Sequence, residues 1–367
     1  MSLGLSRWSG RLALLFGGLV VGLCTAEVGF RWARPDDAVD LLYNAPDNAP
    51  DGLYTTDSRV FSVPTPGFRG VQKSLGYAVD LRINTLGLRG PELGPKKGLR
   101  YLAAGDSFTM AAQVAEQETF AQRLAGDLNA EFLNAGVDGY GTYQVIERYR
   151  QLDEVADLDG VLLTFFVGND VHDNVRWPQI RAEAQRMVPG RPLSRRPVGA
   201  LHGFLYKRST LYAAYQMWLR RRAMANPNFP ERHRWKSELM LFMQEGAGVL
   251  GAQISATNNA LSDLKRATTE RGDTLMVAIA PPAFQIETER LDATFRLVGL
   301  NPDNARPDAV SNAVKDLLKR HHIRHCDLVE PLRRANQSGG EMYLRYDGHW
   351  SPKGHAVVAD AIERCMQ

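Results

Sequence analysis

Two motifs at opposite ends of this 367-residue chain contain the residue types of a serine nucleophile and its base. Ser107 lies in Gly-Asp-Ser-Phe-Thr, and His349 lies in Asp-Gly-His-Trp near the C-terminus. Asp347 can accept the Nδ1–H of His349, which leaves Nε2 free to take the proton of a serine hydroxyl. We therefore predict Ser107 as nucleophile, His349 as general base and Asp347 as the carboxylate that orients it.

Two further polar turns offer donors for the negative charge that forms when a serine attacks a carbonyl group. Gly139 lies in Asn-Ala-Gly-Val-Asp-Gly-Tyr-Gly, and Asn169 lies in Val-Gly-Asn-Asp. Taken singly, the first could be only a glycine-rich turn and the second an Asx-turn. Together they predict an oxyanion hole made of the Ser107 N–H, the Gly139 N–H and the Asn169 amide.

The segments that must position these motifs alternate between apolar strands and helices. Strands are predicted at 100–104, 131–134, 160–167, 274–280 and about 323–328, and helices at about 119–128, 142–152, 308–320 and 352–364. Continuous apolar strands between helices indicate a parallel sheet buried on both faces. Ligands of such sheets bind outside the carboxyl ends of the strands, where Ser107, Gly139 and Asn169 fall. The predicted fold class is α/β, a flavodoxin-like three-layer α/β/α sandwich with a five-stranded parallel sheet.

The order of these motifs resembles the four blocks of the SGNH (GDSL-like) hydrolase superfamily, which carry Ser, Gly, Asn and His. The matching residues are Ser107, Gly139, Asn169 and His349. Residues 83–92, Ile-Asn-Thr-Leu-Gly-Leu-Arg-Gly-Pro-Glu, also resemble the lead-in of bacterial membrane-anchored members. The resemblance runs from about residue 83 to the C-terminus, apart from an insertion, and it implies an enzyme that acts on ester bonds.

The spacing of the Asp-His element departs from the commonest hydrolases of that superfamily, which have two residues between Asp and His. Here Gly348 alone separates them, and Trp350 follows. This shorter element resembles the SGNH-like O-acetyltransferases of bacterial exopolysaccharide systems, although there it precedes the serine block. The choice between water and a sugar hydroxyl as acyl acceptor therefore stays open.

The N-terminal 34 residues have the pattern of a membrane anchor or a signal segment. Arg7 and Arg11 precede an apolar run at 12–26, which is short for a comfortable bilayer span. We favour an uncleaved anchor in the inner (cytoplasmic) membrane over a cleaved signal peptide. Residues 35–98 are expected to be a linker and packing extension, with an edge strand or hairpin arm at 77–83. The catalytic domain, 99–367, would then lie in the periplasm or outside the cell.

The strand and helix alternation is interrupted at about 171–272, which we interpret as a helical insertion. Aromatic residues alternate there with basic residues at roughly helical spacing, at Phe204, Tyr206, Lys207, Arg208, Tyr212, Tyr215, Trp218 and 220–222. The favoured interpretation is a cap over the active site with buried aromatics, and the alternative is a basic amphipathic helix on an anionic membrane. Asp106, His172 and Trp350 are expected in the wall of the pocket.

Composition narrows the classes of partner and cofactor. A formal net charge of +3 without a clustered basic face indicates no nucleic-acid partner. The cysteines Cys24, Cys326 and Cys365 fit no metal-ligand spacing, and the remaining histidines lack partners at such spacing, so neither a metal nor another cofactor is expected. A disulfide between Cys326 and Cys365 is possible outside the cytosol.

Three functions remain after these exclusions. The first is hydrolysis of an acetyl or short-chain acyl ester on an envelope or extracellular carbohydrate, through an acyl-Ser107 intermediate. The second is O-acyl transfer to an exopolysaccharide or other glycan, with a membrane partner as acyl donor. The third is a non-catalytic glycan-binding module, which has no need of a serine, an aspartate and a histidine together.

Overall fold

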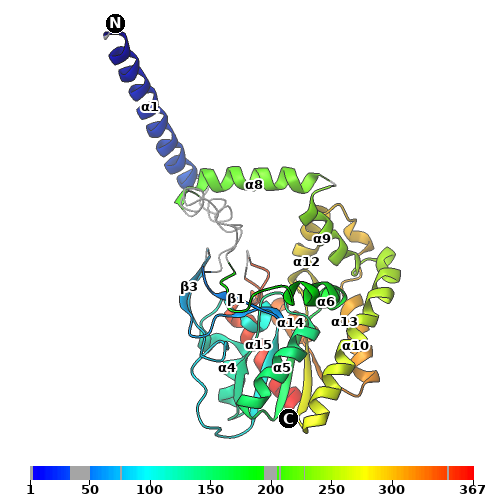
Figure 1. Cartoon of the computed structure of the whole chain (residues 1–367). Helices are drawn as coiled ribbons and strands as arrows, with labels where there is room; N and C mark the ends of the chain where they lie inside the picture. Colours follow the sequence, from blue (N-terminus) through cyan, green and yellow to red (C-terminus); the bar gives the residue numbers. More distant parts are fainter. Residues whose placement is uncertain are drawn as a thin grey trace. The chain divides into compact units, whose positions relative to one another are not determined.

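The computed structural model describes residues 3–33, 50–74, 77–193, 205, 208–226, 228–344 and 347–367 (Figure 1). The chain forms two compact units. The larger unit comprises Ala49–Ser194 and Met224–Gln367, and the smaller comprises Met1–Asn48 and Arg195–Ala223.

The larger unit is built on a five-stranded parallel sheet with the strand order β6-β5-β7-β8-β9. The strands are β5 (Arg100–Gly105), β6 (Glu131–Asn134), β7 (Gly160–Phe166), β8 (Thr274–Ala280) and β9 (Arg324–Asp327). In chain order this arrangement is 2-1-3-4-5, the flavodoxin-like order. The predicted fold class is therefore confirmed, and each strand lies within a few residues of its predicted position.

Helices cover both faces of the sheet, so alternate residues of one strand enter different apolar clusters. In β7, Leu163 packs in a cluster with Tyr149 of α5 (Thr142–Ala156), whereas Leu162 packs in a cluster with Phe120 of α4 (Phe120–Asp127). The helices of the larger unit are α3 (Ser107–Met110), α4 (Phe120–Asp127), α5 (Thr142–Ala156), α6 (Asp170–Ala184), α9 (Pro230–Met240), α10 (Ala247–Arg271), α11 (Ala283–Ile286), α12 (Thr288–Leu297), α13 (Ala309–Arg320), α14 (Val329–Gln337) and α15 (Pro352–Met366). Thr119 caps α4, because its hydroxyl accepts a hydrogen bond from the Gln122 N–H.

Two antiparallel hairpins precede the sheet, formed by β1 (Tyr54–Asp57) with β2 (Phe61–Pro64) and by β3 (Arg69–Ser74) with β4 (Tyr77–Arg82). In the described residues neither hairpin pairs with the parallel sheet, so β4 is a hairpin arm and not an edge strand of that sheet. Leu81 and Ile83 pack with Met110 and Ala112, which follow Ser107. The hairpin of β3 and β4 is therefore attached next to the predicted nucleophile.

The predicted insertion at about 171–272 is too wide at both ends. Helix α6 begins four residues after β7, and α10 ends three residues before β8 and packs against α5, α6 and α13. Both helices thus belong to the layered domain. The sequence pattern did not show that α10 belongs to the layered domain. The residues that this helix buries include small and polar ones, such as Ala260, Thr257 and Thr268, and only a few leucines.

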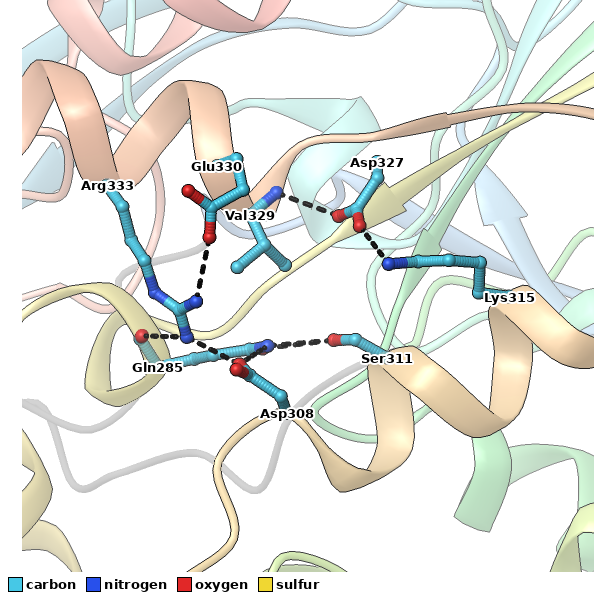
Figure 2. Close-up of polar contacts among 8 residues, drawn as sticks. All are labelled: Gln285, Asp308, Ser311, Lys315, Asp327, Val329, Glu330 and Arg333. Atoms are coloured by element: carbon cyan, nitrogen blue, oxygen red, sulfur yellow. Dashed lines mark hydrogen bonds and ion pairs between the residues drawn. The ribbon is translucent and has the colours of Figure 1, made fainter.

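A polar network joins the last strand to the helices around it (Figure 2). The Arg333 guanidinium pairs with Asp308 and with Glu330 and also donates to the carbonyl of Gln285 at 3.3 Å. Lys315 of α13 pairs with Asp327 of β9. These contacts fix α13 and α14 beside β9.

A disulfide between Cys326 of β9 and Cys365 of α15 closes a segment of the chain with a sequence separation of 39 residues. Asp347 and His349 both lie within this closed segment. Closing a loop of this length restricts the unfolded chain, and the effect is typically worth about 3–4 kcal/mol.

The smaller unit contains α1 (Leu3–Ala33) and most of α8 (Thr210–Ala225). Within α1, the window Leu14–Ala33 has a mean hydropathy of 1.5 and is unburied, so it is long and apolar enough to cross a membrane. The Glu27 carboxylate accepts hydrogen bonds from the N–H groups of Thr210 and Leu211 at 2.6 and 3.0 Å. An acceptor at this position satisfies N–H groups that a helix start otherwise leaves unpaired.

Two of the aromatic residues that were predicted to be buried in a cap are exposed to solvent. Tyr215 and Trp218 of α8 are 53% and 50% exposed. The cap interpretation is wrong for these two side chains, because no element of the smaller unit covers them in the described part of the chain. Phe204, Tyr206 and Lys207 lie outside the described residues.

Candidate active site

Ser107 is presented by a turn that only glycine can make. Gly105, the last residue of β5, has a φ of +150°, and a Cβ there would lie 2.5 Å from Thr109 Oγ1 and 2.6 Å from the carbonyl oxygen of Thr164. The turn leads directly into α3, where Ser107 is the first residue. The Asp106 carboxylate caps this helix by accepting a hydrogen bond from the Phe108 N–H at 2.9 Å.

The predicted triad is assembled in the structure. His349 Nε2 lies 2.7 Å from Ser107 Oγ, and His349 Nδ1 hydrogen-bonds to Asp347 Oδ1. The same carboxylate oxygen accepts the backbone N–H of His349 at 3.2 Å, which fixes the turn of Asp-Gly-His. The three groups therefore form a continuous hydrogen-bonded line from carboxylate to hydroxyl, the arrangement that lets an imidazole take a proton from a serine.

One residue that sequence reasoning missed holds this line in place. The Tyr77 hydroxyl donates to Asp347 Oδ2 at 3.0 Å, so both carboxylate oxygens have partners. The Gln113 side-chain nitrogen lies 3.2 Å from His349 Nδ1, but both atoms are donors when Nδ1–H donates to Asp347, so Gln113 is a neighbour of the imidazole and not its hydrogen-bond partner. Tyr77 begins β4, so the predicted packing extension contributes a side chain that supports the triad directly.

The triad residues have pKa values displaced in opposite directions. For Asp347, burial alone would raise the pKa, but the charge and hydrogen bonds of His349 and the Tyr77 hydroxyl outweigh burial and lower it. For His349, burial alone would lower the pKa, but Asp347 outweighs burial and raises the pKa above its ordinary value of 6.5. Asp347 therefore stays ionised, and the structure favours a protonated His349 more than water does.

Trp350, expected in the pocket wall, lies beneath the triad instead. Its side chain is fully buried, with ring centroids 4.9 Å from Phe108 and 6.1 Å from Phe120 in edge contacts. The Phe108 ring also lies 4.9 Å from His349. The expectation for Trp350 is therefore wrong, because its ring is fully buried and does not line the cleft.

The three predicted oxyanion donors all border the same cleft as His349. Gly139 follows β6 in the turn that contains Gly136, where a Cβ would lie 2.1 Å from the backbone nitrogen of Met110, so the absence of a side chain allows this turn to approach α3. Asn169 directly precedes α6. Ser107, Gly139 and Asn169 thus come together from the ends of three neighbouring strands, while their role as donors stays a prediction.

The cleft in front of Ser107 encloses about 700 Å³. Asp106 lines it as predicted, but His172 does not, because this histidine lies on a part of α6 outside the cleft wall. Residues that sequence reasoning missed also line it, from α6 and α9: Asp173, Arg176, Ile180, Glu183, Arg234, Trp235, Glu238 and Leu239. Part of the predicted insertion, α9, therefore does form a wall of the site. No group of His, Cys, Asp and Glu that could hold a metal ion is found among the described residues.

Comparison with known proteins relates the C-terminal part of the chain to one family. Residues 241–367 match the family model described as SGNH hydrolase-like domain, acetyltransferase AlgX. The matched range contains Asp347 and His349, whereas Ser107, Gly139 and Asn169 precede it. No curated protein sequence matches the chain.

Solved structures with similarity to the chain include esterases and hydrolases. One is a catalytic variant of Axe2, an acetylxylan esterase from Geobacillus stearothermophilus, at 13% identity and a TM-score of 0.40, covering 74% of this chain and 95% of that chain. Another is LAE5, an alpha/beta hydrolase enzyme from the metagenome of Lake Arreo, Spain, at 15% identity and a TM-score of 0.35, with coverage of 74% and 95%. Likenesses at these TM-scores carry no argument about activity.

Burial and the Asp347 carboxylate have opposing effects on the pKa of His349, and a titration can test this. We expect the pKa of His349 to lie above 6.5 in the wild-type chain and to fall below its wild-type value in Asp347→Asn, because burial then acts without the compensating carboxylate. Imidazole NMR signals followed against pH measure both values. His355, whose pKa burial lowers to about 3, is the internal control and stays neutral throughout. Equal His349 pKa values in the two chains would contradict the assigned role of Asp347.

Proposed function

We propose that this chain is a serine esterase of the SGNH superfamily, which hydrolyses acetyl or short-chain acyl esters of a carbohydrate. The observation that carries the proposal is the 2.7 Å contact between His349 Nε2 and Ser107 Oγ, with Asp347 on the far side of the imidazole. A glycan-binding module without catalysis would not require this alignment, so we do not pursue that alternative.

In the first half-reaction, Ser107 Oγ attacks the ester carbonyl carbon while His349 Nε2 takes the hydroxyl proton. The Ser107 N–H, the Gly139 N–H and the Asn169 amide then donate to the oxyanion of the tetrahedral intermediate. When the intermediate collapses, the bond to the leaving alcohol breaks, and His349 returns the proton to that alcohol. The products of this step are a free sugar hydroxyl and an acyl ester on Ser107.

In the second half-reaction, an acceptor hydroxyl attacks the acyl-Ser107 carbonyl carbon and gives its proton to His349 Nε2. The bond between the acyl carbon and Ser107 Oγ then breaks, and His349 returns the proton to Ser107 Oγ. Water as acceptor completes hydrolysis, whereas a sugar hydroxyl completes transfer. O-acyl transfer to a glycan is the second candidate function, and two observations favour it: the family match of residues 241–367 and the single Gly348 between Asp347 and His349. A membrane partner would then supply the acyl donor.

We further propose that the chain is anchored in the inner membrane by α1, with the larger unit in the periplasm or outside the cell. The apolar window Leu14–Ala33 supports the anchor, although a signal segment has the same pattern. The disulfide of Cys326 and Cys365 supports an oxidising compartment, since such bonds are rare in the cytosol.

The esterase proposal predicts serine-dependent turnover. We expect the full chain in detergent to hydrolyse p-nitrophenyl acetate, and Ser107→Ala to abolish this activity, because the acyl intermediate forms on Ser107 Oγ, the hydroxyl beside His349 Nε2. Ser338→Ala, at an exposed serine of the larger unit, is the matched control and should retain full activity. Since neutral His349 is the base and its pKa is raised, kcat/KM should fall as the pH drops through a value above 6.5.

Hydrolysis and transfer are separated by acceptor competition in the same assay. Added oligosaccharide should divert acetyl groups from water to sugar only if the chain is a transferase, and acetylated sugar is then detected directly. Activity that persists in Ser107→Ala would contradict both functions.

The proposed oxyanion hole predicts that removing the Asn169 amide lowers kcat strongly. Asn169→Ala should lower kcat about 10²–10³-fold, which corresponds to about 2.7–4 kcal/mol of transition-state stabilisation, with a smaller change in KM. Asn312→Ala, at an exposed position of α13, is the control for a general effect of removing an amide. A loss that appears mainly in KM would show that Asn169 binds substrate and does not stabilise the oxyanion.

A further inference from the structure

The wall of the cleft formed by α6 and α9 contains carboxylates with few hydrogen-bond donors. Asp173 of α6 is only 7% exposed, and its closest described cation, Arg176, lies 3.7 Å away. Glu238 of α9 is 3.5 Å from Arg234. These separations are long for charge-assisted hydrogen bonds, so both carboxylates keep acceptor capacity toward the cleft.

Acidic side chains outnumber basic side chains along this cleft. Its lining includes two arginines, each already beside a carboxylate, and three further acidic side chains: Asp106, Asp138 and Glu183. Burial raises the pKa of Asp173 to about 7 and also raises the pKa of Glu238, which means that their charged forms are poorly solvated. A hydroxyl donor beside them relieves this cost, whereas another anion adds to it.

The same wall also offers apolar surface. Trp235 lies between Arg234 and Glu238 on α9, and Phe284 and Phe166 line the cleft as well. A cleft with a few polar acceptors among aromatic side chains suits a ligand that is apolar on its faces and carries hydroxyl groups at its edge. A pyranose ring has this character.

We propose that this wall is a binding subsite for a glycan without acidic groups, in which Asp173 and Glu238 accept hydrogen bonds from sugar hydroxyls beside Trp235. The inference rests on the proposed function, because it names the substrate class of the same site. It also excludes a class, since uronic acids would place carboxylates next to desolvated carboxylates.

Binding to the full-length Ser107→Ala chain tests the subsite without requiring catalysis. Calorimetry in detergent compares neutral oligosaccharides of glucose, mannose and galactose with their counterparts oxidised to carboxylates at C6. We expect at least one neutral sugar to bind and its acidic counterpart to bind about tenfold or more weakly at low salt. Added salt should reduce this preference, because it screens the repulsion.

A double variant tests the assigned residues. Asp173→Asn with Glu238→Gln should remove the preference or reverse it, because Arg176 and Arg234 then lack their acidic neighbours. The matched control is Asp263→Asn with Glu270→Gln, which removes the same charge from carboxylates that pair with Arg266 outside the cleft.

Three results would overturn the subsite: binding of no neutral sugar, equal or tighter binding of the acidic sugars, or an equal loss of preference in the control. Failure of p-nitrophenyl acetate turnover in the wild-type chain would instead count against the proposed catalysis and leave the binding result standing.

Discussion

The hydrogen-bonded line from Asp347 through His349 to Ser107 depends on bringing together residues 242 positions apart in the sequence. The parallel sheet achieves this because the carboxyl end of β5 and the turn before α15 meet at one edge. The buried Phe108 ring packs against the His349 ring and is itself in contact with the buried Trp350 ring. The closed segment from Cys326 to Cys365 limits how far the Asp-His turn can move. The chemistry that we propose follows from these packing constraints.

The carboxylates near Ser107 differ in how the structure treats their charge. Asp347 has partners on both oxygens, which lower its pKa, whereas burial raises the pKa of Asp106 to about 7 and that of Asp170 well above its ordinary value. Asp106 Oδ2 has no hydrogen-bond partner among the described residues. Environments that push the pKa values of neighbouring carboxyls apart assign them different roles. The ionised one orients the imidazole, whereas burial disfavours the charged forms of the other two.

Much of the fold and the triad was predictable because their signals are local. The strand of 100–104 ends at a glycine turn, and the spacing of Asp347 and His349 places both on one turn, so the sequence alone indicates their roles. Tyr77 and Trp235 have no such signal, since their contacts depend on tertiary packing of a hairpin and of α9. The expectations for His172 and Trp350 failed because proximity in sequence to Asn169 and His349 does not decide which way a side chain points. The width of the insertion was overestimated because α10 buries many small side chains.

The most direct test of the account is to locate the acyl group during turnover. The full chain in detergent is mixed with p-nitrophenyl acetate, quenched in acid, digested and examined by mass spectrometry. The account predicts an acetyl group on Ser107 in the wild-type chain and strongly reduced labelling in His349→Ala, because the base that activates the hydroxyl is gone. Acetyl groups found elsewhere, or labelling of Ser107 that is unaffected by loss of His349, would contradict the assignment of nucleophile and base.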